Sequence, residues 1–302
     1  MTERRYPPGC AFVEGRYVPI SEAKISVLDW GLLRSDATYD VVHCWEGRFF
    51  RLDAHLDRFY RSAAKIRLEV PIARDALAPM LAECVRRAGE SVRTAGYVEM
   101  IVTRGVSPTF SRDPRDAIPT FIAFAIPLGF ILKREDWGRG LDVRISPIRR
   151  IPPASVDPTV KNYHWQDLVQ GLYDAYEHGA ENVILTDFED NVTEGPGFNV
   201  FVVKDGIVAT PSEGVLEGIS RDTALQLCDE AGIPVELRTV SPDELHQADE
   251  AFITSTAGGI MPIGKVDGQA LPSCPGPVTL QLQGLYWEKH HDPDWTVGVD
   301  DL

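Results

Sequence analysis

The sequence predicts an α+β protein built from two domains, and three observations support that prediction. The chain has 302 residues, which is more than one average domain and leaves room for one large domain or two moderate ones. Strand-like alternation and helical spacing of apolar residues both recur along it. Proline, glycine and charged residues accumulate in the stretch that ends at Gly140. We therefore expect a small domain at 1–127, a linker at 128–140 and a larger domain at 141–302.

Alternating apolar residues and turn residues predict the elements of the first domain. A hairpin is expected in AFVEGRYVPI and an irregular loop in VLDWGLLRSD. The run ATYDVVHCWEGRFFRL predicts two strands joined at Glu46 and Gly47, and helical spacing of apolar residues predicts helices at 53–68 and 73–88. Two further strands are expected in GYVEMIVTRG and TFIAFAIP.

Strand and helix patterns continue through the second domain. Glycine and charged residues at Lys204-Asp205-Gly206 predict the turn of a hairpin. The elements expected in this domain are a strand at 141–147, a helix at 163–178, a strand at 182–186, a hairpin at 198–209, a helix at 220–231, a strand at 234–240 and a helix near 277–290.

Lys161, in the stretch VDPTVKNYHW, is the lysine best placed to act as a nucleophile. It follows Pro158, which ends any preceding element, and it precedes an amphipathic run, so we expect it where strand gives way to helix. Partial burial and a neighbouring cation would destabilise the ammonium form of such a lysine. The free amine could then form a Schiff base.

Three downstream stretches supply groups that complement this lysine. Glu194, which precedes the strand FNVFVV, suits a place beside a ring nitrogen whose protonated form it would favour. Ile219 and Ser220 open a helix whose N-terminus offers N–H donors to a phosphate. Thr256, in TSTAGG, adds a hydroxyl beside two glycines that can form an anion-binding nest. Each feature alone is an ordinary helix start or loop, but the ordered set predicts a pyridoxal 5′-phosphate site.

The order of Lys161, TEGPGFNVFVVKDGIVATP, GVLEGISRD and TSTAGGIMPI resembles the fold-type IV pyridoxal-phosphate aminotransferases, the aminodeoxychorismate lyase/D-amino acid aminotransferase-like fold. This family includes branched-chain L-amino acid, D-amino acid and (R)-selective amine transaminases. The resemblance runs from about residue 11 to 295 and includes SDATYDVVHCWEGRFFRLDAHLDRFYRSAAKIRL. It implies two domains with the cofactor at their interface and a homodimer that completes each site.

The resemblance also implies roles for individual residues. Lys161 would be the catalytic residue, holding the cofactor as a Schiff base and moving the substrate proton, and Glu194 would pair with the ring nitrogen. The phosphate would be bound by the side chain of Arg58, in RLDAHLDR, and by Ile219, Ser220 and Thr256. Many relatives have threonine where this chain has Ser220, a departure that keeps the hydroxyl.

The segment Tyr97-Val98-Glu99 bears on the choice of substrate. Branched-chain relatives have an arginine of the substrate pocket at the position of Glu99. A buried carboxylate about 5 Å from a substrate carboxylate would cost roughly 3 kcal/mol at an effective dielectric near 20, more than about a hundredfold in affinity. Glu99 therefore disfavours an α-carboxylate in the pose usual for branched-chain substrates.

The remaining pocket residues resemble those of (R)-selective amine transaminases. Without the resemblance they would be interpreted as core, and Glu99 as a strand residue that faces solvent. The residues assigned to the substrate pocket from strands and from positions near the lysine and the glycine loop are Tyr39, Val41, Tyr97, Glu99, Trp165 and Ala257.

A keto acid acceptor such as pyruvate needs a cation for its carboxylate. The resemblance suggests Arg112 or Arg115, from the loop between two N-terminal strands, and leaves the choice between them open. Arg34, in LLRSDATYD, stands where several amine transaminases have histidine, and it could bind a carboxylate instead. That departure keeps a D-amino acid donor among the alternatives.

The expected reaction is ping-pong transamination from an (R)-amine to a keto acid. Alternatives on the same scaffold are a D-amino acid or branched-chain L-amino acid transaminase and an aminodeoxychorismate-type lyase. A dimeric binding protein without catalysis is an alternative from another class, which Lys161 and Glu194 argue against.

Composition excludes several other functions. The net charge of −15 and the pI near 4.9 argue against nucleic acid and anionic membranes as partners. The five cysteines form no CxxC pair, so they fit free thiols in a reducing compartment better than a disulfide frame or a metal site. The N-terminus MTERRYPPG has no apolar core and does not resemble a signal peptide. We therefore expect a cytoplasmic protein whose partners are small molecules and a second copy of itself.

Overall fold

The structure is a computed structural model, and it describes residues 6–302. These residues form two compact units. The first comprises the chain up to Gly129 together with Val160–Tyr163 and His290–Leu302, and the second comprises Phe130–Thr159 and His164–Lys289. The domain boundaries at 1–127, 128–140 and 141–302 stay a prediction. Residues 1–5, part of the N-terminal stretch interpreted above, lie outside the described residues.

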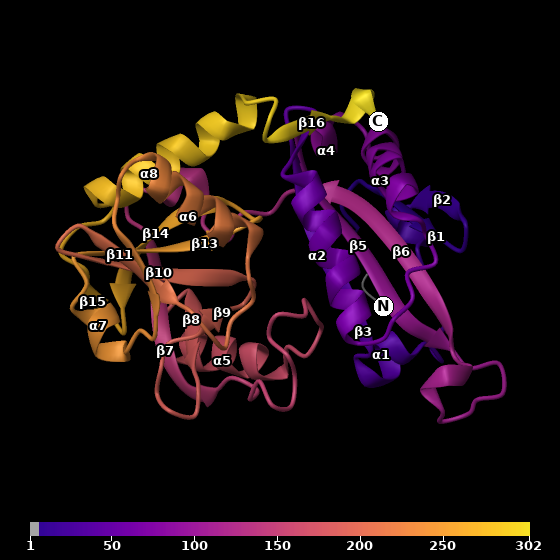
Figure 1. The fold of residues 1–302 in the computed structure, drawn as a ribbon, viewed down its shortest axis with the longest axis horizontal. Coiled ribbons are helices and arrows are strands. Elements are labelled where there is room, and N and C mark those ends of the chain that lie inside the picture. Colours follow the sequence, from indigo (N-terminus) through magenta and orange to yellow (C-terminus); the bar gives the residue numbers. More distant parts are fainter. Residues whose placement is uncertain (1–5) are drawn as a thin grey trace. The chain divides into compact units, whose positions relative to one another are not determined.

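The first unit is built on a seven-stranded antiparallel sheet (Figure 1). Its strand order is β16-β4-β3-β5-β6-β1-β2. The hairpin β1–β2 and the pair β3–β4 confirm the turns predicted at the N-terminal end of the chain. The strands are β1 (Cys10–Val13), β2 (Arg16–Pro19), β3 (Ala37–Trp45), β4 (Arg48–Phe50), β5 (Ala95–Val106), β6 (Ile118–Pro127) and β16 (Thr296–Gly298).

Helices α2 (Leu52–Lys65) and α3 (Arg74–Ala88) pack on this sheet and confirm the two predicted helices. They bury leucine, valine and phenylalanine side chains against β3, β5 and β6, which forms the core of the unit. The short helix α4 (Glu90–Thr94) leads into β5.

One prediction for this unit was wrong. The segment VLDWGLLRSD, expected to be an irregular loop, contains helix α1 (Trp30–Arg34). The Asp29 side chain accepts a hydrogen bond from the backbone N–H of Gly31 at 2.8 Å, and Trp30 is buried. An N-cap and one buried indole stabilise a turn that is too short to show apolar periodicity.

The second unit is built on a mixed nine-stranded sheet with the main order β12-β11-β10-β13-β14-β7-β8. β7 pairs parallel with β8 and β14, and β11 pairs parallel with β12, whereas β10, β11, β13 and β14 are joined by antiparallel pairs. The strands are β7 (Leu141–Arg149), β8 (Asn182–Thr186), β9 (Glu194–Gly195), β10 (Phe198–Lys204), β11 (Ile207–Pro211), β12 (Val235–Arg238), β13 (Glu250–Ser255), β14 (Gly259–Val266) and β15 (Gln269–Ala270).

Helices cover this sheet in the places that the sequence indicates. α5 (Gln166–Glu177) packs on β7 and β8, and α6 (Ile219–Glu230) and α8 (Pro277–Glu288) pack on each other and on β13 and β14. A short helix, α7 (Pro242–His246), precedes β13. The hairpin β10–β11 and these three longer helices confirm the prediction. Strands β13 and β14 were not predicted from the sequence. Every residue of β13 is buried, as in a strand that is covered on both faces.

Helices and strands occur in both units, which confirms the α+β class. Among residues 6–302, no helix has both the length and the apolar composition needed to cross a bilayer. All five cysteines are free, and four of them are buried.

Candidate active site

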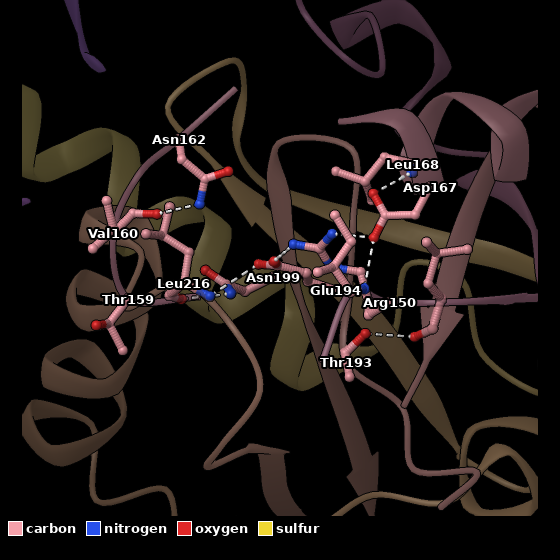
Figure 2. Close-up of polar contacts among 12 residues, drawn as sticks. Arg150, Thr159, Val160, Asn162, Asp167, Leu168, Thr193, Glu194, Asn199 and Leu216 are labelled. Carbon is pink, nitrogen blue, oxygen red and sulfur yellow. Dashed lines mark hydrogen bonds and ion pairs between the residues drawn. The ribbon is translucent and has the colours of Figure 1, made fainter. Parts of the chain in front are cut away.

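The backbone around Lys161 is hydrogen-bonded to the start of β3 in the first unit. The Lys161 carbonyl accepts hydrogen bonds from the Thr38 hydroxyl at 2.6 Å and from the Tyr39 N–H at 3.1 Å. Asn162 forms an isolated bridge with Thr38, and its side-chain amide donates to the Val160 carbonyl at 2.8 Å (Figure 2). These bonds explain why residues 160–163 pack with the first unit although their neighbours belong to the second.

An aromatic ring lies beside the Lys161 amine within the first unit. Its Nζ atom lies 4.5 Å from the centroid of the Tyr39 ring. Tyr39 stacks in turn on Tyr163, with centroids 4.2 Å apart and planes inclined by 14°. Lys161 is half-buried and Tyr39 is buried. The face of the Tyr39 ring therefore lies against the amine, a contact typical of a cation–π pair.

Glu99, on β5, is buried with 6% of its surface exposed. Its two carboxylate oxygens accept from two phenols, one from the Tyr97 hydroxyl at 3.0 Å and the other from the Tyr163 hydroxyl. Burial raises the pKa of Glu99 above its ordinary value, and the two phenol hydrogen bonds and the charge of Lys161 oppose that rise. The interpretation of Glu99 as a strand residue that faces solvent is wrong.

Arg58, on α2, is held by a buried carboxylate. Its Nε and Nη2 atoms donate to the two oxygens of Asp40 at 2.7 and 2.8 Å, and Nδ1 of His55 lies 2.8 Å from Asp40 Oδ1. Burial opposes ionisation of Asp40, but the charge of Arg58 and the hydrogen bonds from Arg58 and His55 keep its pKa below the usual range. A bidentate pair of this kind fixes the plane of the guanidinium.

Glu194 occupies β9 in the second unit, where one guanidinium and one backbone N–H hold it (Figure 2). Arg150 Nη2 donates to Glu194 Oε1 at 2.9 Å, and the Leu216 N–H donates to Oε2 at 3.0 Å. Arg150 also pairs with Asp167, which accepts from the backbone N–H of Ile151 at 2.9 Å. Burial opposes the charge on Arg150, but Glu194 and Asp167 outweigh that effect and raise its pKa.

The N-terminus of α6 follows Gly218 directly. A Cβ atom at Gly218 would clash with the Asn199 side-chain oxygen, so this approach of the chain requires glycine. The Asn199 amide donates to the Leu216 carbonyl at 2.9 Å, which ties the same loop to β10 (Figure 2). The buried hydroxyl of Ser220 lies 3.2 Å from the Tyr286 hydroxyl, and Ile219 is buried beside it.

The loop between β13 and β14, which contains Gly258, is held by hydrogen bonds of Ser255. The Ser255 hydroxyl donates to the Gly197 carbonyl at 2.8 Å and accepts from the Ala257 N–H at 3.1 Å. The Ala257 carbonyl accepts from the Ile131 N–H at 3.0 Å, and Thr256, between them, is half-buried. These bonds fix the backbone on both sides of the Thr256 hydroxyl.

The remaining expected pocket residues differ in burial, and Val41 lies opposite Glu99 where β3 pairs with β5. Arg34 is exposed and its guanidinium lies 3.9 Å above the Trp30 ring, while Arg115 is exposed and paired with Asp113. Arg112 is exposed on the same loop as Arg115. Val41 is buried on β3, and Trp165 packs against the cluster of α5 and β8 in the second unit.

The side chains present fit pyridoxal 5′-phosphate by their chemistry. A half-buried amine at Lys161 can form a Schiff base, and Glu194 offers a buried carboxylate to a protonated ring nitrogen. Phosphate donors are available at the N-terminus of α6 and at the Ser220 hydroxyl, and Arg58 supplies a fixed cation. The assigned roles of these residues remain a prediction.

Local sequence patterns did not indicate four residues that hold the assigned site residues in place. These residues are Arg150, Asp167, Asp40 and Tyr163. Tyr163 stands two positions after Lys161 and could have been found by that proximity. Arg150 and Asp167 join groups far apart in sequence, and no local pattern marks such a network.

Comparisons with known proteins agree with this set of groups. The family described as amino-transferase class IV matches residues 37–266. The chain is 33% identical to a putative branched-chain-amino-acid aminotransferase of Methanocaldococcus jannaschii, over 96% of this chain and 99% of the relative. It is 32% identical to a D-alanine aminotransferase of Bacillus licheniformis, over 89% and 93% of the two chains.

Solved structures show the same fold. A branched-chain aminotransferase of Thermoproteus uzoniensis with norvaline superposes with a TM-score of 0.88 at 29% identity, covering 96% of this chain and 99% of that chain. A T.th. branched-chain amino acid aminotransferase with pyridoxamine 5′-phosphate gives a TM-score of 0.90 at 28% identity, covering 98% and 100%.

Proposed function

The chain belongs to the class IV aminotransferases, which use pyridoxal 5′-phosphate, and we propose that its donor is an (R)-amine without an α-carboxylate and its acceptor a keto acid such as pyruvate. The burial of Glu99 between two phenols is the observation that carries this donor assignment. This position offers a donor carboxylate no cation.

Glu99 disfavours a donor carboxylate in either of its protonation states. An ionised Glu99 repels a donor carboxylate, at a cost of roughly 3 kcal/mol for two charges about 5 Å apart at an effective dielectric near 20. A neutral Glu99 removes the repulsion but still supplies no positive charge. Tyr39, Tyr97 and Tyr163 add aromatic surface, which suits a donor with an aryl or alkyl group in place of the carboxylate.

An amino acid donor is the second candidate, and the relatives support it more directly than they support an (R)-amine. Their names are those of branched-chain and D-alanine aminotransferases. A D-amino acid or branched-chain L-amino acid would need a cation elsewhere, for which Arg34, Arg112 and Arg115 are the available assignments. Their exposure leaves these guanidinium groups accessible to solvent and substrate.

The proposed cofactor contacts use the residues that the family resemblance assigns. Lys161 would hold the cofactor through Nζ, and Glu194 would accept the hydrogen bond of its ring N–H. Arg58, the N-terminal N–H groups of α6 at Ile219 and Ser220, and the Thr256 hydroxyl would hold the phosphate. When bound, pyridoxal 5′-phosphate supplies an electron sink for the carbon that loses its proton.

Lys161 also has the acid–base role in this proposal. Its neutral Nζ removes the proton from the donor's amine-bearing carbon, holds it, and returns it one step later, because no other amine lies among the assigned residues. Arg150 and the Leu216 N–H keep the Glu194 carboxylate oriented during both half-reactions. The ketone product leaves before the keto acid binds, which makes the kinetics ping-pong.

We also propose that the enzyme works as a homodimer in the cytoplasm on small molecules, without nucleic acid or membrane as partner. The family resemblance supports the dimer, and the free cysteines and acidic charge fit that compartment. Sedimentation of the holoenzyme at several concentrations tests the dimer.

A spectral half-reaction tests the donor. The holoenzyme is mixed in separate cuvettes with (R)-1-phenylethylamine, its (S) enantiomer, D-alanine or L-leucine, and the loss of the cofactor's absorbance band is followed. Conversion by the (R)-amine, with recovery on addition of pyruvate, is the expected result. Conversion by D-alanine or L-leucine alone would establish the second candidate, and release of pyruvate from an amino acid without any keto acid would indicate a lyase.

A further inference from the structure

We propose that Tyr163 is a positioning residue that sets donor choice by holding Glu99, an inference that rests on the amine donor proposed above. Tyr163 has no assigned role in the reaction, yet it joins the segment that carries Lys161 to the buried carboxylate on β5. Glu99 is the group that meets the donor, and Tyr163 is the group that holds Glu99 in position.

The position of the Tyr163 ring is fixed at three points within the first unit. Its backbone follows the bridge between Asn162 and Thr38, so it continues from the segment bound to β3. Its ring stacks on the buried Tyr39, with centroids 4.2 Å apart. Its hydroxyl donates to Glu99 Oε1, while Tyr97 donates to Oε2. Tyr163 is thus held through its backbone, its ring face and its hydroxyl.

Toward an ionised Glu99 the two phenols act as hydrogen-bond donors. Burial, reinforced by the Glu99 charge, raises the pKa of both Tyr97 and Tyr163 above the ordinary value for tyrosine. Both hydroxyls therefore remain protonated, and each gives one hydrogen bond to a carboxylate oxygen. Hydrogen bonds of this kind stabilise the ionised carboxylate without cancelling its charge.

Four titratable groups face Glu99 from the elements around it. Tyr97 lies on the same strand, Tyr163 and Lys161 come from the segment bound to β3, and Asp40 lies on β3 itself. Hydrogen bonds from the tyrosines and the charge of Lys161 favour ionised Glu99, whereas burial and the Asp40 charge disfavour it. Loss of the Tyr163 hydroxyl therefore shifts Glu99 toward its neutral form.

This shift predicts a change in preference between donors. With Glu99 less often ionised, a donor carboxylate is repelled less, whereas a neutral side group is little affected. The ratio of kcat/KM for (R)-1-phenylethylamine to kcat/KM for D-alanine or L-leucine should fall by about 10-fold in Tyr163→Phe, the effect of losing one hydrogen bond to a charged group. It should fall further in Glu99→Gln.

The test is a double-mutant cycle on the holoenzyme. The ratio is measured for wild type, Tyr163→Phe, Glu99→Gln and the double variant, each from pH 6 to pH 9. Tyr173→Phe, at a tyrosine of α5 that is 60% exposed, is the matched control and should leave the ratio unchanged. The cofactor absorbance band and the thermal unfolding midpoint of each variant show that it is folded and loaded.

Three results support the proposal together. Tyr163→Phe lowers the ratio. It has no further effect in the Glu99→Gln background. The ratio falls as pH is lowered, and in Tyr163→Phe the midpoint of this fall lies at a higher pH than in wild type. The pH shift has that sign because removal of a donor from the charged form raises the pKa of a carboxylate.

Other outcomes overturn it. An equal effect of Tyr163→Phe in the Glu99→Gln background would mean that the phenol acts on the donor directly. A lowered ratio in Glu99→Gln with an unchanged ratio in Tyr163→Phe would leave the proposed function in place and remove the role of Tyr163. An unchanged ratio in both would instead remove Glu99 from donor choice and with it the basis of the proposed amine donor.

Discussion

Glu194 in the second unit and Glu99 in the first are both buried, with 8% and 6% of their surfaces exposed, but they have different partners. Glu194 receives a guanidinium hydrogen bond from Arg150 and a backbone hydrogen bond from Leu216. Glu99 receives two hydrogen bonds from neutral phenols. Glu194 is paired with a cation in direct contact, whereas Glu99 accepts hydrogen bonds from two hydroxyls and is subject to the charge of Lys161.

This difference shows how one residue type can serve two purposes. A carboxylate paired with arginine keeps a fixed charge and a fixed orientation, as a partner for a ring nitrogen needs. A carboxylate held by phenols has neutral hydrogen-bond partners, and in its ionised form it can discriminate between substrates with and without a carboxylate. Asp40 resembles Glu194, since it pairs with Arg58.

The largest expected effect comes from Lys161, on which both half-reactions are proposed to depend. Lys161→Ala removes the group that carries and returns the substrate proton, so turnover with every donor should fall by about 10²–10⁴-fold or more. Stopped-flow half-reactions measure the loss, and borohydride treatment followed by mass spectrometry should no longer fix the cofactor to the chain. Lys204→Ala, at an exposed lysine paired with Asp249, is the control. A variant at Lys161 that kept the wild-type rate would contradict the assignment.

The second-largest effect is expected from removal of Arg150, which would leave Glu194 without a cation in contact with it. Arg150→Met leaves Glu194 and Asp167 buried without their shared guanidinium, which should destabilise the protein by about 3–5 kcal/mol. Arg149→Met, which breaks a pair with the exposed Asp190, should cost no more than about 1 kcal/mol. Urea unfolding measures both. Equal losses in the two variants would mean that burial does not distinguish these ion pairs.

A smaller effect is expected from the loop whose N–H holds Glu194. Gly218→Ala places a methyl group against the Asn199 amide, and overpacking of this kind costs about 1–3 kcal/mol. Gly284→Ala, on α8, adds a methyl group with nothing within 4 Å and should be stabilising by about 0.4–1 kcal/mol. Thermal unfolding of the two variants should shift the midpoint in opposite directions. A neutral Gly218→Ala would show that the loop can move away from Asn199.

The smallest effect concerns His55, which contacts Asp40. Burial lowers the pKa of His55 below its ordinary value of 6.5, against the opposing effect of Asp40. Its contribution to stability is therefore present above about pH 6.5 and is lost as pH falls toward the lower pKa of the folded state, by at most about 1.4 kcal/mol per pH unit. The stability of His55→Gln should depend less on pH between 6.5 and 5.5. His178→Gln, at an exposed histidine, should keep the wild-type slope.

The sequence predicted most of the fold because its longer elements have strong periodicity. α2, α3, α5, α6 and α8 all occur where apolar spacing indicates, and the hairpins β1–β2 and β10–β11 follow their turn residues. α1 escaped prediction because an Asp29 cap and one buried indole stabilise only five residues. β13 has no alternation to reveal it, since both of its faces are buried.

The sequence indicated the chemistry of the site residues, but it did not indicate which side chains would pair with them. Lys161 and Glu194 stand in local contexts that indicate their chemistry, such as a lysine between a proline and a helix. The partners Asp40 for Arg58, Arg150 for Glu194 and Tyr163 for Glu99 are separated by 18, 44 and 64 positions. Such pairs depend on sheet register and loop paths, which local patterns do not specify.

The contrast between the two carboxylates is tested most directly by comparing half-reaction rates of Glu99→Gln and Glu194→Gln with (R)-1-phenylethylamine and with D-alanine. The account predicts that Glu194→Gln slows both donors by the same factor and leaves their ratio unchanged. It predicts that Glu99→Gln changes the ratio in favour of D-alanine. A changed ratio in Glu194→Gln together with an unchanged ratio in Glu99→Gln would contradict the proposed division of roles.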